Sequence, residues 1–269
     1  MREAGVSIED RGFQFADSVY EVWGVRDGRM LDDAGHFARL HRTLGELRIG
    51  WTMSDAALRV ILRETMRRNQ VRDGLIYLQV SRGAAPRDHV FPAPAVKPTI
   101  VVTAKSLDPA ALDARAAKGV AVITLPETRW ARCDLKTTGL LPNVLARQKA
   151  KEEGAFEAWF VDRDGFVTEG TASNAWIVDT QSRLRTRPLS NSILHGVTRA
   201  AIIELARERQ LTIIEEPFTV EEAKAAREAF ITSASNSAVP VVSIDGARIG
   251  DGSPSPTALR LRDAYFGAE

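Results

Sequence analysis

The sequence contains little cysteine and no long apolar run. Cys133 is the single cysteine among 269 residues, so an intramolecular disulfide is impossible and a reducing compartment, the cytoplasm by default, is expected. Nowhere do about 18 uninterrupted apolar residues occur, the length that spans a bilayer. The opening residues, MREAGVSIEDRG, also lack the apolar stretch of a signal peptide. These absences predict a soluble protein.

An excess of charge of one sign is missing too. The formal net charge is +1, with 44% hydrophobic and 26% charged residues. This composition is ordinary for a folded protein and far from that of disordered chains. Because sequence-independent phosphate binding needs clustered surplus Lys and Arg, we expect neither a nucleic-acid nor a membrane partner.

Several familiar enzyme motifs are absent as well. The chain has no GxGxxG, GxxxxGK[ST], GxSxG or HExxH. These are the usual cues for dinucleotide binding, P-loop nucleotide binding, the hydrolase nucleophile and zinc proteases. One cysteine with scattered histidines also makes a poor zinc site, so we expect no metal. Chemistry has to come from other residues.

The N-terminal part has the pattern of a small α+β module. Strands are expected at residues 19–25, 74–82 and 98–104, which are rich in β-branched and aromatic residues. Between the first two, an apolar stripe from Phe37 to Leu47 predicts one helix, and Ser54 is a typical N-cap for a second. Residues 106–118 have little to bury. We therefore expect domains at residues 1–110 and 119–269, joined by a linker at 111–118.

The C-terminal part has the pattern of a larger, strand-rich domain. Strands are expected at residues 120–125, 155–161, 173–178, 211–215, 229–233 and 239–244, and helices at 143–153 and 198–209. Asp162 to Gly165 suits a tight turn, and Thr219 with Glu222 forms a capping box for a short helix. Regular βαβ alternation is missing, so the fold class is α+β.

Two polar segments are candidates for chemistry. Lys136 lies in RWARCDLKTTGLL, and Glu169 lies in TEGTASN. Taken alone, Lys136 is typical of a solvated surface lysine and the second segment is typical of a turn. A lysine that attacks an aldehyde needs an enclosed site that favours its neutral amine.

Two further segments, GVTR at 196–199 and TSAS at 232–235, offer N–H groups and hydroxyls that suit a phosphate. A capped helix and a polar loop explain them equally well.

Together these segments resemble a known family in order and spacing. The chain is similar to class IV aminotransferases, the fold type IV pyridoxal 5′-phosphate (PLP) enzymes, from about Ile8 to its end. The D-amino acid aminotransferase branch is the nearest. The resemblance rests on IEDRGFQFADSVYEV, RGAAPRDHVFP, RWARCDLKTTGLLPNVLARQKAKEEGAFEA, VTEGTASNAW, ILHGVTR and FITSASNSAVP. It implies a two-domain α+β fold with a small N-terminal and a larger strand-rich C-terminal domain.

The resemblance also implies roles for the cofactor-binding residues. Lys136 forms the Schiff base with PLP and carries protons between the substrate Cα and the cofactor, and Glu169 faces the pyridine nitrogen. Arg39 matches the family's phosphate-binding arginine, although its position beside an apolar stripe also suits a surface arginine. The remaining phosphate-binding residues are Val197, Thr198, Ser233 and Ala234.

The resemblance to the D-amino acid branch further implies that Tyr20 from one subunit and Arg87 with His89 from its neighbour hold the substrate α-carboxylate. A homodimer follows, because a monomer would have an incomplete site. The side of the cofactor on which the carboxylate is held selects the enantiomer. We therefore expect D-alanine or D-glutamate to react with pyruvate or 2-oxoglutarate.

Other activities share this scaffold. Aminodeoxychorismate lyase is disfavoured by Arg87 and His89. Trp23 and Gly24 leave (R)-amine transamination open, and branched-chain amino acid transamination also remains an alternative. A binding protein that has lost catalysis is disfavoured by the presence of both Lys136 and Glu169.

Overall fold

The computed structural model describes residues 4–267 and divides into two compact units. Unit 1 comprises the chain up to Leu107 together with Leu135–Leu140, and unit 2 comprises Asp108–Asp134 and the chain from Leu141 onward. The chain therefore leaves unit 2 for six residues and returns to it. No helix within residues 4–267 is both long and apolar enough to cross a membrane.

The segment that was expected to be a linker between the domains is a helix instead. Residues 111–118 belong to a helix, α4 (Pro109–Lys118), which is part of unit 2. Asp108 caps this helix by accepting from the Ala110 N–H, and Pro109 occupies its first turn, where a missing N–H costs nothing. A scarcity of apolar residues suggested a linker, but a good cap and one buried position, Ala116, suffice in this fold.

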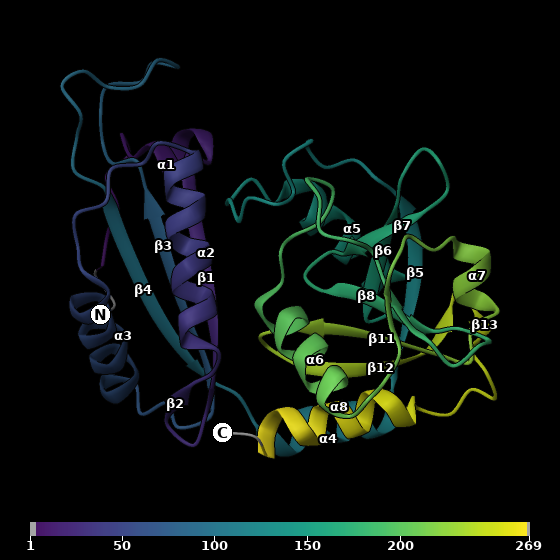
Figure 1. The fold of residues 1–269 in the computed structure, drawn as a ribbon. Coiled ribbons are helices and arrows are strands. Elements are labelled where there is room, and N and C mark those ends of the chain that lie inside the picture. Colours follow the sequence, from purple (N-terminus) through teal and green to yellow (C-terminus); the bar gives the residue numbers. More distant parts are fainter. Residues whose placement is uncertain (1–3, 268–269) are drawn as a thin grey trace. The chain divides into compact units, whose positions relative to one another are not determined.

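Unit 1 is a four-stranded antiparallel sheet in the order β2-β1-β3-β4 (Figure 1). Its strands are β1 (Ser18–Arg26), β2 (Arg29–Met30), β3 (Gly74–Ser81) and β4 (Thr99–Ser106). Its helices are α1 (Arg11–Phe15), α2 (Asp33–Glu46) and α3 (Asp55–Arg68). The expected Ser54 cap is confirmed, since its side chain accepts from the Ala57 N–H. The three expected strands and both expected helices are present.

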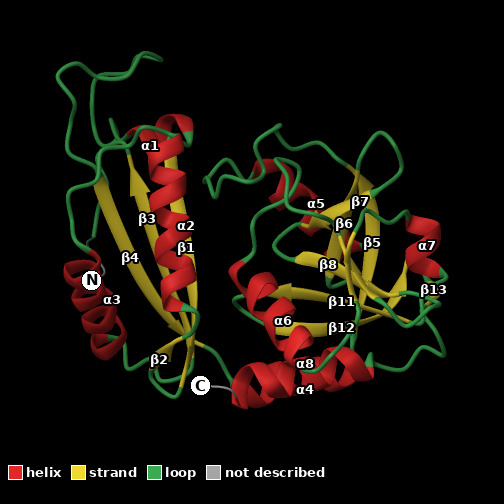
Figure 2. Cartoon of the chain, in the orientation of Figure 1, coloured by secondary structure: helices red, strands yellow, loops and turns green. Residues whose placement is uncertain are grey.

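The two faces of this sheet differ, because side chains alternate along a strand. Trp23 and Ile76 lie opposite each other and pack with Leu40 of α2 and Leu62 of α3 in the buried core. Tyr20 points to the other face, where its ring lies 5.6 Å from that of Tyr77. Figure 2 shows α2 and α3 beside the sheet.

The segment Leu135–Leu140 joins unit 1 by pairing with the start of β1. Tyr20 N–H donates to the Lys136 carbonyl at 3.0 Å, and Thr138 N–H donates to the Ser18 carbonyl at 3.2 Å. An isolated bridge joins Val19 to Thr137. The hydroxyls of Ser18 and Thr138 are also hydrogen-bonded. The sheet of unit 1 thus positions the backbone of Lys136.

Unit 2 contains a mixed nine-stranded sheet in the order β10-β9-β8-β11-β12-β5-β6-β7, with β13 paired to β12. Its strands are β5 (Val120–Pro126), β6 (Glu157–Val161), β7 (Val167–Gly170), β8 (Asn174–Val178), β9 (Leu184–Thr186), β10 (Ile213–Glu215), β11 (Glu228–Ser233), β12 (Ser237–Ile244) and β13 (Ala247–Arg248). The six expected strands are confirmed. The residues of β7 were interpreted as a polar turn, but all four are buried and Glu169 has buried partners.

Helices α5 (Leu141–Glu152), α6 (Val197–Glu208), α7 (Val220–Lys224) and α8 (Pro256–Gly267) complete unit 2 with α4 (Figure 1). The Thr219–Glu222 capping box of α7 is confirmed. Helix α8 was not predicted. Its buried face mixes Thr257 and Arg262 with Ala258, Leu261 and Tyr265, so the apolar stripe is short and is interrupted by polar residues. Glu228 holds its first turn by accepting from the Thr257 N–H at 3.0 Å.

Candidate functional site

Lys136 lies in unit 1 above an aromatic side chain. Its Nζ is 4.1 Å from the centre of the Tyr20 ring, and its backbone is fixed by the pairing with β1. Tyr20 and Tyr77 form a continuous aromatic surface on the face of the sheet opposite α2 and α3. Burial, followed by the proximity of Tyr20, raises the pKa of Tyr77 to about 12, so its hydroxyl stays protonated and donates to Gln79 at 2.8 Å. The lysine is partly enclosed by these neighbours.

Glu169 lies on β7 in unit 2, where its carboxylate is almost fully buried. Arg129 donates to it at 2.6 Å, Asn174 Nδ2 at 3.0 Å, and the Leu194 N–H reaches both oxygens at 3.0 Å. Burying a charge is costly unless it is paired and hydrogen-bonded, and these donors meet that condition. The arrangement holds a fixed anion in a water-poor environment.

Arg129 was not assigned a role from the sequence. It lies seven residues before Lys136 in the same motif and bridges two carboxylates, Glu169 and Glu127. Burial would raise the pKa of Glu127, but its hydrogen bonds with Arg129 and the charge of Arg129 lower it. An arginine in the same polar segment as the candidate lysine could have suggested a site residue. Its partner Glu127 is two residues away in sequence, but Glu169 is 40 residues away, so that contact could not be read from the segment.

The start of α6 has the features of an anion-binding site. Its N-cap, Gly196, provides no side-chain cap, so the first N–H groups of the helix stay available. A Cβ at Gly196 would lie 2.0 Å from Asn174 Oδ1, so glycine is required for this close approach. Thr198 Oγ1 is buried and has no hydrogen-bond partner among the described residues. Val197 and Thr198 thus begin the helix, and the hydroxyl of Thr198 is left to bind a ligand.

A second polar segment of unit 2 is the turn between β11 and β12, residues 233–237. Ser233 and Ser235 are joined through their hydroxyls at 3.2 Å, and Asn236 Nδ2 donates to Ser235 Oγ at 2.8 Å. Ser237 adopts a left-handed conformation with φ of 54°, and its buried Oγ lacks a hydrogen-bond partner in the part of the chain that the structure describes. Ala234 offers its backbone alone.

Arg39 lies in unit 1 on α2 and is buried. Its Nε and Nη2 donate to the two oxygens of Glu21 at 2.8 and 2.7 Å, and His36 Nδ1 lies 2.8 Å from the same carboxylate. Burial would raise the pKa of Glu21, but the charge and hydrogen bonds of Arg39 and the hydrogen bond with His36 lower it to about 2. Burial outweighs Glu21 in its effect on His36 and lowers the His36 pKa. Glu21 and His36 were not assigned roles from the sequence.

Arg87 and His89 lie in unit 1 on the exposed loop that follows β3. Phe15 of α1 supports both, with its ring centre 4.8 Å from the Arg87 guanidinium and 5.4 Å from the His89 ring. Arg11 of α1 anchors the loop by donating to the carbonyl of Asp88 at 2.6 Å. The loop therefore presents a cation and an imidazole to solvent on a braced backbone.

Each unit thus gathers some of the predicted site residues. Unit 1 brings Lys136 to Tyr20 and carries Arg39, Arg87 and His89. The members within unit 2 are Glu169, Val197, Thr198, Ser233 and Ala234. Asn174 connects two of these groups, since it donates to Glu169 and lies against Gly196.

Comparison with known proteins gives consistent matches over nearly the whole chain. A model of the family described as amino-transferase class IV matches residues 18–244. D-alanine aminotransferase of Bacillus licheniformis is 42% identical over 262 residues, which cover 97% of this chain and 91% of that protein. The enzyme of the same name from Staphylococcus haemolyticus is 39% identical over 98% of this chain and 92% of its own length. A T.th. branched-chain amino acid aminotransferase, solved with pyridoxamine 5′-phosphate, superposes with a TM-score of 0.90 at 26% identity, covering 100% of this chain and 90% of that one.

Proposed function

Because the chain belongs to the class IV aminotransferase family, we propose that it transfers the amino group of a D-amino acid, D-alanine or D-glutamate, to pyruvate or 2-oxoglutarate. Enzymes of this family depend on PLP, and the chain has their fold type IV, α+β architecture. The single observation that carries the proposal is the buried Glu169 carboxylate with its three donors, because a fixed anion is what a protonated pyridine nitrogen needs as a partner.

The residues of unit 2 fit the phosphate of the cofactor. Gly196 leaves the first N–H groups of α6 uncapped, and Thr198 has a buried hydroxyl without a partner among residues 4–267. Phosphate oxygens are strong acceptors for both kinds of donor. Val197, Thr198, Ser233 and Ala234 are the residues that we assign to the phosphate, and Arg39 is assigned to it from unit 1.

When bound, PLP supplies a carbonyl carbon that takes up the amino group and a ring that accepts electrons released from the substrate Cα. Lys136 would bind that carbonyl carbon and, once displaced by the substrate amine, move a proton between the substrate Cα and C4′ of the cofactor. Glu169 would hold the proton of the pyridine nitrogen. The position of the Lys136 amine, 4.1 Å from the centre of the Tyr20 ring, supports this role, because Tyr20 is a residue assigned to the substrate.

The substrate carboxylate is assigned to Tyr20, Arg87 and His89, with the last two provided by a second copy of the chain. Arg87 and His89 are exposed and braced by Phe15 and Arg11, so they are available to a neighbouring subunit. A guanidinium binds a carboxylate through two parallel N–H donors, which fixes its orientation. The proposed functional form is a homodimer whose sites are completed across the interface.

The test is the visible absorption spectrum of the purified protein with PLP, recorded before and after adding D-alanine, L-alanine or an (R)-amine separately. We expect a visible absorption band from PLP bound to a lysine, which only the D-amino acid converts to the shorter-wavelength pyridoxamine form. Lys136→Ala should abolish the band and turnover, and Glu169→Gln should lower turnover while keeping the cofactor. Conversion by L-alanine or the amine would contradict the D-amino acid assignment, and the absence of any band would contradict PLP chemistry.

A further inference from the structure

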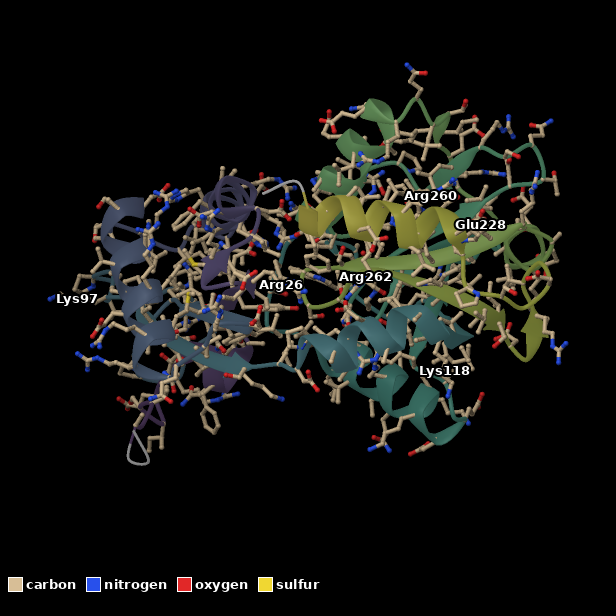
Figure 3. All side chains as sticks on the ribbon, turned by 90° about the horizontal axis from the view of Figure 1, so that it is seen from below. Arg26, Lys97, Lys118, Glu228, Arg260 and Arg262 are labelled. Carbon is tan, nitrogen blue, oxygen red and sulfur yellow. The ribbon has the colours of Figure 1, made fainter. Side chains whose placement is uncertain are left out.

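Arg262 is a buried arginine in the C-terminal helix α8 that none of the roles above uses. Its side chain is 4% exposed. Nη1 donates to the carbonyl of Asn236, in the 233–237 turn, and lies 3.5 Å from the carbonyl of Ala238. In Figure 3 Arg262 lies between α8 and α4, whereas Arg260 lies on the other side of α8. An arginine is almost never fully buried unless it is paired. The carbonyl groups of Asn236 and Ala238 therefore fix where the Arg262 guanidinium lies.

A second arginine reaches the same turn from another helix. Arg115 of α4 donates from Nη1 to Asn236 Oδ1 at 2.9 Å. Its guanidinium is also stacked on Phe156, with 4.9 Å between the guanidinium carbon and the ring centre. Asn236 is therefore held at its backbone by α8 and at its side chain by α4.

Asn236 in turn contacts the two serines of the turn, Ser233 and Ser235. Its Nδ2 donates to Ser235 Oγ at 2.8 Å and lies 3.5 Å from Ser233 Oγ, and its N–H donates to the Ser233 carbonyl at 3.3 Å. With its side-chain oxygen bound by Arg115, the amide of Asn236 has its NH₂ directed at the serines.

The two guanidiniums also place positive charge beside the turn. Among the groups that they contact, Asp113 carries a negative charge and accepts from Arg262 Nη2 at 2.8 Å. The Asp113 side chain is 52% exposed, so water screens part of its effect. The buried Arg262 is less well screened, and an anion bound at the turn would experience its field.

We infer that Arg262 and Arg115 are positioning residues for the cofactor phosphate, which they hold indirectly by fixing the 233–237 turn through Asn236. This inference rests on the proposed function, since it takes Ser233 and Ala234 as phosphate-binding residues. It makes the C-terminal helix, which lies outside the region matched by the family model, a determinant of cofactor affinity.

The test compares the apoenzymes of wild type, Arg262→Met, Arg262→Lys and Arg115→Met for binding of PLP and of pyridoxal, which lacks the phosphate. We expect the dissociation constant for PLP to rise about tenfold in Arg262→Met, as when a residue supporting a ligand-binding group is lost. Pyridoxal affinity should stay unchanged, and Arg262→Lys should recover part of the loss. Arg260→Met is the matched control, because Arg260 is exposed on the same helix and should bind PLP like the wild type.

The ratio of PLP to pyridoxal affinity separates positioning from general damage to the fold. Equal weakening of both ligands, or unchanged PLP affinity, in the Arg262 and Arg115 variants would overturn the inference while leaving the proposed function intact. Failure of the wild type to bind PLP would overturn both. If Arg262→Met does not fold, Arg115→Met decides the matter, since Arg115 is half-buried on a separate helix and acts on the same Asn236.

Discussion

Glu21 makes the stability of unit 1 depend on pH. It is buried between Arg39 and His36, and its pKa is lowered to about 2 from an ordinary value of 4.5. A carboxyl whose pKa is lower in the folded state adds stability above its unfolded pKa and loses it as the pH falls through its folded pKa. The Glu21 contribution is therefore complete near neutral pH and declines below about pH 4.5.

Glu21→Gln should destabilise the protein by about 3 kcal/mol at pH 7, because it leaves Arg39 buried without its anion. The difference from wild type should narrow by about 2 kcal/mol at pH 3, because Glu21 takes up a proton there in the unfolded chain while it stays ionised in the folded protein. Urea unfolding at both pH values measures this difference. Glu64→Gln is the control: hydrogen bonds with Arg67 and Arg68 also lower the pKa of Glu64, but these pairs are exposed and screened by water, so the difference should narrow much less. A difference that stays constant with pH would contradict the pairing.

At the scale of elements, the decisive piece is the six-residue segment Leu135–Leu140. It follows a stretch of unit 2 and precedes α5, yet it pairs with β1 of unit 1. Its polar, non-periodic sequence predicts no element, because its hydrogen bonds go to Ser18 and Tyr20, more than 100 residues away. Sequence patterns reveal local periodicity, whereas a bridge between distant segments depends on which edge the tertiary fold leaves unpaired.

Thr138→Val should destabilise unit 1 by about 1 kcal/mol, because it removes the hydroxyl bonded to Ser18 at nearly constant volume. Since the bond braces the backbone next to Lys136, proteolysis near residues 135–140 should also become faster. Chemical denaturation and limited proteolysis measure these effects. Thr65→Val is a control, as the Thr65 hydroxyl donates to the Ile61 carbonyl of its own helix, α3, in an exposed hydrogen bond. Equal stability of the Thr138 variant and wild type would show that the backbone pairing alone holds the segment.

At the scale of the whole molecule, the proposed homodimer divides each site between two chains. If Arg87 acts across the interface, mixing inactive Arg87→Ala and Lys136→Ala subunits restores one complete site in each mixed dimer. Random reassembly would then recover about a quarter of wild-type activity, because half of the dimers are mixed and each has one working site. The measurement is transaminase activity after joint unfolding and refolding. If Arg87 served its own chain, every site would carry one defect and no activity would return.

The sequence by itself determined the order of most elements and the identity of the chemical groups. Alternation in residues 19–25, the Ser54 cap and the Thr219–Glu222 box are local signals, so β1, α3 and α7 were predictable. The tertiary structure alone decided that the helix at residues 109–118 belongs to unit 2, that α8 buries Arg262, and that Arg129 meets Glu169. The physical reason is that a polar residue can be buried only where partners are brought to it, and those partners come from distant parts of the chain.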